Sequence, residues 1–166
     1  ELGRMAAEGL HMNVLVWTGG RPMSRPSWEP VTEADSRDRL LENSDFVALC
    51  LPSTRETRYG MTYGDFQKMK NSACLINTSR GNLIREEDLI RALKEHLIRG
   101  AGLDVFDQEP PAPDNPLLTM EQVIATPHFA AVTEDAMQRM SLEGAQELYR
   151  ALRGEKPAWP VTAART

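Results

Sequence analysis

The apolar residues of this chain gather in short continuous runs, and these runs alternate with segments of helical periodicity. Five such runs are present: "NVLVW" (13–17), "FVALC" (46–50), "ACLIN" (73–77), "AGLDVF" (101–106) and "QVIAT" (122–126). Because apolar residues follow one another instead of alternating with polar ones, each run predicts a strand buried on both faces. The sequence therefore predicts a three-layer α/β/α fold around a mostly parallel sheet.

Helix signals fill the spaces between the runs. The segment "REEDLIRALKEH" (85–96) has acidic residues first and basic residues later, and Gly100 follows it. Shorter helices are predicted at 36–44 and 63–71. A last helix should begin at the N-cap residue Thr133, and we interpret the apolar stripe that it carries as part of a core.

Composition narrows the choice of partners. The chain has 19 basic and 24 acidic residues, a net charge of -5, and neither a basic stripe nor interleaved aromatic residues, so nucleic acid or an anionic membrane is not expected as a partner. No apolar run approaches the roughly 20 residues of a membrane span, and the start lacks the apolar core of a signal peptide. We predict a soluble, cytoplasmic protein.

The two cysteines and three histidines do not form a metal motif. Cys50 and Cys74 lie inside apolar runs, where cysteine usually serves as a small buried hydrophobic residue. Neither has the paired spacing of a zinc site, and the histidines are far apart in sequence. We predict two reduced thiols and no structural metal.

In a parallel sheet, ligands bind at the carboxyl ends of the strands. The residues that directly follow the apolar runs carry the chemistry of this chain: Thr18, Pro52, the segment 78–80, the segment 104–109 and His128. An arginine, a glutamate and a histidine therefore come to one crevice. A cation, a carboxylate and a titratable ring are groups that acid–base catalysis commonly uses.

Each of these three residues also has a purely structural interpretation. His128 can be a histidine at a strand end that bonds a nearby carbonyl. Arg80 can cap its strand and pair with Glu86 or Glu87. Glu109 can be a solvated charge in a proline-rich loop.

Three signatures, taken together, favour the catalytic interpretation. They are "LINTSRGNLIREEDLIRAL", "GLDVFDQEP" and "ATPHFA", in this order and with strands between them. From about residue 1 to 161 the chain resembles the D-isomer-specific 2-hydroxyacid dehydrogenases. The resemblance implies a Rossmann-like fold and hydride transfer between NAD(P)H and a small 2-keto or 2-hydroxy acid. It further implies that Arg80 holds the substrate, that His128 donates the proton, and that Glu109 orients the ring of His128 and favours its protonated form.

The resemblance also implies cofactor contacts, among which Asp104 faces the nicotinamide carboxamide. After the second strand of such a domain, an acidic residue normally accepts the ribose hydroxyls. Here Thr18 and Arg21 stand there without an acidic residue in "VWTGGRP", which slightly favours NADP over NAD. The complete predicted cofactor set is Thr18, Arg21, Leu51, Pro52, Thr57, Thr78, Ser79, Arg80, Asp104, His128 and Ala130.

The chain also departs from the family pattern. It contains no G-x-G-x-x-G, the cradle that binds the pyrophosphate in such domains. We interpret 1–153 as a partial dinucleotide-binding domain without its first strand and glycine loop, and 154–166 as an exit segment toward a substrate domain. The chain by itself is then expected to bind a dinucleotide weakly.

Three functions remain open at this point. The first is a dehydrogenase that works as a homodimer in the parent protein. The second is a dinucleotide-sensing binding module, similar to the corepressor relatives of these enzymes. The third is formate dehydrogenase, but those enzymes have glutamine at the position of Glu109, so the pairing of Glu109 with His128 favours keto-acid reduction.

Overall fold

Parallel strands form the framework of the chain in the computed structural model, which describes residues 1–20 and 31–160. The helices and short helical turns are α1 (Leu2–Arg4), η1 (Met5–Gly9), α2 (Arg37–Asn43), α3 (Tyr63–Phe66), η2 (Gly81–Leu83), α4 (Glu86–Lys94), η3 (Pro116–Leu118) and α5 (Glu134–Leu152). The strands are β1 (Val14–Val16), β2 (Val31–Glu33), β3 (Phe46–Leu49), β4 (Cys74–Asn77), β5 (Gly100–Leu103) and β6 (Val123–Ala125).

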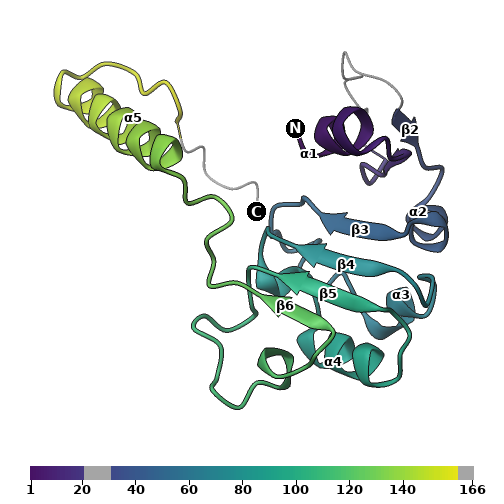
Figure 1. Cartoon of the computed structure of the whole chain (residues 1–166). Coiled ribbons are helices and arrows are strands. Elements are labelled where there is room, and N and C mark those ends of the chain that lie inside the picture. The colour runs from purple at the N-terminus through teal and green to yellow at the C-terminus, as the bar shows by residue number, and fades with distance from the viewer. Residues whose placement is uncertain (21–30, 161–166) are drawn as a thin grey trace. The chain divides into compact units, whose positions relative to one another are not determined.

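The strands divide into two sheets. β1 pairs with β2, and β3, β4, β5 and β6 form a second sheet in that order, as Figure 1 shows. Every pair is parallel, so all the carboxyl ends within a sheet lie at one edge. The predicted parallel α/β architecture is confirmed. Five of the described strands were predicted; β2 was not, because "VTE" is short and mostly polar.

The core lies between the four-stranded sheet and two helices. Leu75 of β4 and Leu103 of β5 pack in one buried cluster with Phe66 of α3 and with Leu89 and Leu93 of α4. The helical spacing of the two α4 leucines turns both toward the sheet. This packing holds the carboxyl edge of β4 and β5 in place.

The opposite face of the sheet is less covered. Cys74 and Ile76 of β4 and Gly102 of β5 are only partly buried, and Phe46 on the outer strand β3 is exposed. The expected burial on both faces therefore holds for one face only, because α3 and α4 supply their apolar side chains to that face. Cys50, expected to be buried, is exposed because it follows the last residue of β3.

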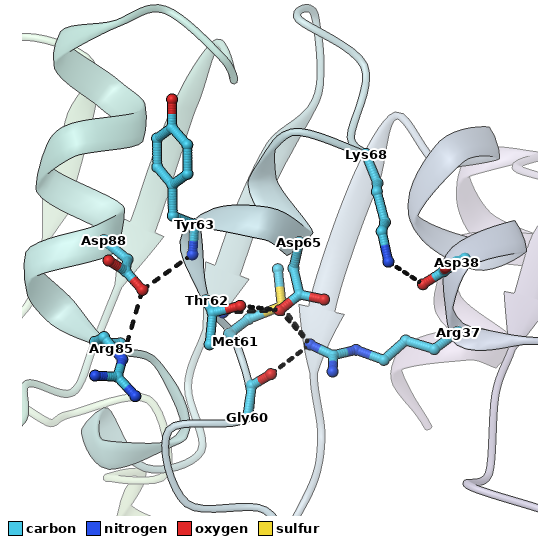
Figure 2. Close-up of polar contacts among 10 residues, drawn as sticks. All are labelled: Arg37, Asp38, Gly60, Met61, Thr62, Tyr63, Asp65, Lys68, Arg85 and Asp88. Carbon is cyan, nitrogen blue, oxygen red and sulfur yellow. Dashed lines mark hydrogen bonds and ion pairs between the residues drawn. The ribbon is translucent and has the colours of Figure 1, made fainter.

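A polar brace joins the start of α2 to α3, as Figure 2 shows. The guanidinium of Arg37 donates to the carbonyl of Gly60 at 2.6 Å and lies 3.1 Å from the carboxylate of Asp65. Asp65 is buried and also accepts from the backbone and hydroxyl of Thr62, at 2.8 and 2.9 Å. The buried carboxylate is thus both paired with a charge and hydrogen-bonded, as a stable buried charge requires.

The described residues from 129 to 160 belong to a separate compact unit, of which α5 is the main element. The predicted N-cap is confirmed, since the Thr133 hydroxyl accepts from the N–H of Ala136 at 3.1 Å. Beyond the helix, the chain returns and Glu147 accepts from the N–H of Ala158 at 2.8 Å. This unit buries no residue of α5, so the apolar stripe interpreted as core is not covered within it. Within the described ranges, no helix combines the length and apolarity needed to cross a membrane.

Candidate active site

A hollow of about 530 Å³ opens at the carboxyl ends of β3 and β4. It is lined by residues 49–53 and 78–80. Five of the residues predicted to bind cofactor lie in this lining: Leu51, Pro52, Thr78, Ser79 and Arg80. Segments nearly 30 residues apart in the sequence meet here because β3 and β4 are neighbouring parallel strands.

A buried asparagine shapes the turn that presents Arg80. Asn77, the last residue of β4, is fully buried; its side-chain amide donates to the carbonyl of Arg80 at 2.9 Å and accepts from the N–H of Ser79 at 3.1 Å. The Ser79 hydroxyl in turn donates to the carbonyl of Leu51 at 2.5 Å. Sequence reasoning missed Asn77, although a polar residue at the end of an otherwise apolar run was a usable signal.

Arg80 is exposed at this edge, and its guanidinium donates to the carbonyl of Ser79 at 2.7 Å. The structure does not show the alternative pairing of Arg80 with Glu86 or Glu87. Both carboxylate oxygens of Glu86 instead accept hydrogen bonds from the segment that follows β5. The positive charge of Arg80 makes a small contribution to lowering the pKa of Glu109.

Glu109 and His128 form a direct pair. Oε2 of Glu109 lies 2.7 Å from Nδ1 of His128, and Oε1 of Glu109 accepts from the N–H of Phe106 at 3.1 Å. His128 has a φ of 58°, a left-handed conformation that is uncommon for residues other than glycine. This backbone turn after β6 is a local strain of the kind found at functional sites.

The electrostatics of the pair determine which ring nitrogen is free. Partial burial raises the pKa of Glu109, but hydrogen bonds from His128 and from the N–H of Phe106, together with the charges of His128 and Arg80, lower it below its ordinary value. An ionised Glu109 can only accept, so Nδ1 of His128 carries the proton of the shared bond. Nε2 is left for a ligand, and the side chain of His128 is 51% exposed.

A second carboxylate lies at the end of β5. Asp104 is buried, and the hydroxyl of Thr126 donates to it at 2.5 Å. Thr126 was not singled out from the sequence, because a threonine before proline is an ordinary strand end. The predicted Asp104 thus has a hydrogen-bond donor in the residue that directly follows the neighbouring strand β6, as a buried polar group requires.

The remaining predicted residues are distributed differently. The Thr57 hydroxyl donates to the carbonyl of Pro52 at 2.7 Å and so shapes the loop after β3. The Thr18 hydroxyl donates to Glu33 of the adjacent strand at 3.4 Å. Ala130 belongs to the second unit, and Arg21 lies outside the described residues.

Glu33 is therefore an acidic neighbour of Thr18 that sequence reasoning missed. It lies 15 positions further along the chain, and only the pairing of β1 with β2 brings it there. No cluster of metal-ligating side chains occurs in the part of the chain that the structure describes.

Comparison with known families gives one match over most of the chain. Residues 2–130 match the sequence profile described as "D-isomer specific 2-hydroxyacid dehydrogenase, NAD binding domain". This match covers all of the strand-end residues that form the site.

The proteins similar to this chain include enzymes named as reductases and dehydrogenases. The chain is 44% identical over 128 residues to a glyoxylate reductase from Thermofilum pendens, a match that covers 77% of this chain and 38% of that protein. Its structure is similar to that of D-lactate dehydrogenase with NAD⁺ from Lactobacillus jensenii, with a TM-score of 0.83 and 28% identity over 96% of this chain and 51% of the other.

An NADPH-dependent glyoxylate/hydroxypyruvate reductase from Sinorhizobium meliloti, in complex with NADP and sulfate, is also similar. Its TM-score is 0.76, with 28% identity over 95% of this chain and 51% of the other. The chain thus spans about half or less of the length of these relatives.

Proposed function

Because the chain belongs to the D-isomer-specific 2-hydroxyacid dehydrogenase family, through the NAD-binding domain, we propose that the protein carrying it reduces a small 2-keto acid with NAD(P)H. The observation that carries this proposal is the Glu109–His128 pair at 2.7 Å beside Arg80. Glyoxylate and hydroxypyruvate are the substrates proposed first, because similar proteins are named for them.

The residues present fit the nicotinamide end of a dinucleotide better than its pyrophosphate. The hollow beside β3 and β4 and the buried carboxylate of Asp104 suit the nicotinamide end, where a carboxamide offers both a donor and an acceptor. The pyrophosphate has no glycine-rich cradle in this sequence. We propose that Asp104 holds the carboxamide and that residues 51, 52, 78 and 79 line the cofactor.

His128 and Glu109 carry the proton chemistry of the proposed reaction. When bound, a reduced nicotinamide would supply the hydride that the carbonyl carbon accepts. Nε2 of His128 delivers its proton to the carbonyl oxygen and leaves the ring neutral, while Glu109 keeps Nδ1 protonated and the ring oriented. Arg80, with its planar fork of donors, binds the substrate carboxylate and polarises the carbonyl.

The choice between NAD and NADP depends on the edge formed by β1 and β2. Thr18 and Arg21 slightly favour NADP, whereas the carboxylate of Glu33 beside Thr18 favours an unphosphorylated ribose, because it repels a 2′-phosphate. Replacing Glu33 by Gln should therefore raise the affinity for NADPH relative to NADH. Calorimetry with NADPH and with NADH, before and after the substitution, tests this. An unchanged ratio of the two affinities would show that Glu33 takes no part in cofactor selection.

A domain exchange tests the proposed function itself. The matched 128-residue segment of the Thermofilum pendens relative is replaced by the corresponding part of this chain. The chimera should oxidise NAD(P)H when glyoxylate or hydroxypyruvate is added. A folded chimera that binds the cofactor but reduces no 2-keto acid would contradict the proposal and favour the dinucleotide-sensing module.

The homodimer and the cytoplasmic location stay predictions. Sedimentation of the whole protein checks whether it is a homodimer.

A further inference from the structure

We infer that Glu86 is a positioning residue for the Glu109–His128 pair, because its carboxylate holds both ends of the loop that carries Glu109. The catalytic meaning of this role rests on the proposed function, but the structural role does not. The loop runs from residue 107 to 115, between β5 and η3. Glu86 lies within the first of the three signatures, where the only role considered for it was a pairing with Arg80.

Glu86 makes one contact with each end of the loop. Its Oε2 accepts from the backbone N–H of Asp107 at 3.2 Å, and its Oε1 accepts from the side-chain amide of Asn115 at 2.6 Å. Asn115 is itself fixed, because its side-chain oxygen accepts from the N–H of Leu117, a residue that is only 1% exposed. A single carboxylate thus closes the loop.

The helix that carries Glu86 gives this carboxylate a fixed frame. Two residues further along α4, Asp88 accepts from the backbone N–H of Tyr63 at 3.0 Å and pairs with Arg85 at 3.5 Å, as Figure 2 shows. The next residue, Leu89, is buried in the core. The first turn of α4 is therefore held both to the start of α3 and to the sheet.

The loop passes this constraint directly to Glu109. Asp107 stands two residues before Glu109, and the preceding N–H of Phe106 donates to Oε1 of Glu109. The other oxygen of Glu109 contacts His128 at 2.7 Å. Because one carboxylate bridges the loop start and the ring, a displacement of Asp107 changes the direction in which Glu109 meets His128.

Asp107 has one further anchor. The hydroxyl of Tyr59, in the loop after β3, donates to the Asp107 carboxylate at 3.0 and 3.2 Å. This contact leaves the N–H of Asp107 to Glu86. The two anchors act on different groups of Asp107, so removal of the Glu86 carboxylate leaves the contact of Tyr59 intact and is specific to the loop closure.

Three variants separate the contribution of the carboxylate from that of its charge. Glu86→Ala removes both acceptors. Glu86→Gln keeps the shape and one acceptor but places an amide donor against a donor of the loop. Glu87→Gln is the matched control, because Glu87 is the exposed neighbour in the same helical turn, carries the same charge and makes none of these hydrogen bonds.

The experiment follows the ring of His128 and the amide of Asp107 by nuclear magnetic resonance in the full chain. With Glu87→Gln, the shared Nδ1 proton and the amide protection should match the unsubstituted chain. With Glu86→Ala, the Nδ1 signal should broaden into exchange with water, and the Asp107 amide should exchange about tenfold faster or more, since it loses a hydrogen bond to a charged group. The Nδ1 signal and the Asp107 exchange rate of Glu86→Gln should fall between those of Glu87→Gln and Glu86→Ala.

Two results would overturn the inference. One is a folded Glu86→Ala chain in which the His128 signal and the Asp107 exchange are unchanged. The other is the failure of both Glu86 variants to fold while Glu87→Gln folds, which would make Glu86 purely structural.

The same variants in the chimera keep this inference distinct from the proposed function. If the positioning role and the proposed function are both correct, Glu86→Ala lowers the turnover of keto-acid reduction and leaves cofactor affinity near its original value. If the His128 signal changes but neither Glu86→Ala nor Glu109→Gln alters turnover, the positioning role stands and the proposed reaction fails.

Discussion

At the scale of single residues, His128 combines a ring bound to Glu109 with a left-handed backbone at φ 58°. Substitution therefore has two separable effects, because loss of the ring removes the proton donor and a new side chain meets the strained backbone. Asparagine tolerates this conformation better than alanine. In the chimera, both His128→Asn and His128→Ala should lower turnover roughly a hundredfold or more. Steady-state kinetics measures this, with cofactor affinity as the control.

The comparison between the two variants isolates the backbone. His128→Asn should unfold at a higher temperature than His128→Ala, although both lack the ring. Near-normal turnover in either variant would mean that the histidine after β6 is structural and that the proton comes from another group.

Glu109 gives a prediction for pH dependence. Its pKa in the folded chain lies below the ordinary value of 4.5, so the stability that it contributes is complete above that value and is lost as the pH falls through the lower folded pKa. Glu109→Gln should consequently unfold at a lower temperature than the unsubstituted chain near neutral pH. This difference should shrink as the pH falls through the lowered pKa of Glu109, because the protonated acid and the amide are then both neutral. Thermal unfolding followed by circular dichroism checks it, and a difference that stays constant into the acid range contradicts the assignment.

At the scale of elements, the start of η2 packs against the segment after β5 with no space for a side chain. A Cβ on Gly81 would lie 1.9 Å from the carbonyl carbon of Phe106 and 2.5 Å from the N of Asp107. Because both are backbone atoms, the loop that carries Glu109 would have to move. Gly81→Ala should cost about 1–3 kcal/mol of unfolding free energy, in the range of overpacked cores.

Gly102 of β5 provides the matched control for this substitution. A Cβ there has no heavy atom within 4 Å, so Gly102→Ala should leave the unfolding free energy nearly unchanged. Denaturant titration of both variants makes the comparison. Equal effects of the two substitutions would show that the close approach of residues 81 and 106 does not constrain the loop.

At the scale of the whole molecule, we expect dinucleotide binding to depend on more than the strand-end residues described above. In such domains a G-x-G-x-x-G loop at a helix N-terminus binds the pyrophosphate through its backbone N–H groups, and this motif does not occur in the sequence. The 166-residue chain should therefore bind NADH and NADPH much more weakly than the chimera. Calorimetry decides this, since a micromolar dissociation constant for the chain alone, about -8 kcal/mol, contradicts the expectation.

The sequence by itself determined the type of fold and suggested the three residues of the proposed chemistry. Apolar runs report burial, and helical spacing reports a single buried face, so strands, helices and their parallel arrangement follow from local pattern. Arg80, Glu109 and His128 were proposed because each follows an apolar run, because parallel strands end at one edge, and because the three signatures that contain them resemble those of a known family. The limits of the domain stay a prediction.

Only the tertiary structure decided how these residues are held. The Asn77 turn behind Arg80, the carboxylate of Glu86 on the Glu109 loop and the approach of Glu33 to Thr18 all join segments or atoms that carry no pattern along the chain. Hydrogen bonds of this kind depend on distance and direction in space, to which sequence periodicity is insensitive. For the same reason, sequence pattern could indicate that β3 is a strand but could not indicate which of its faces the helices cover.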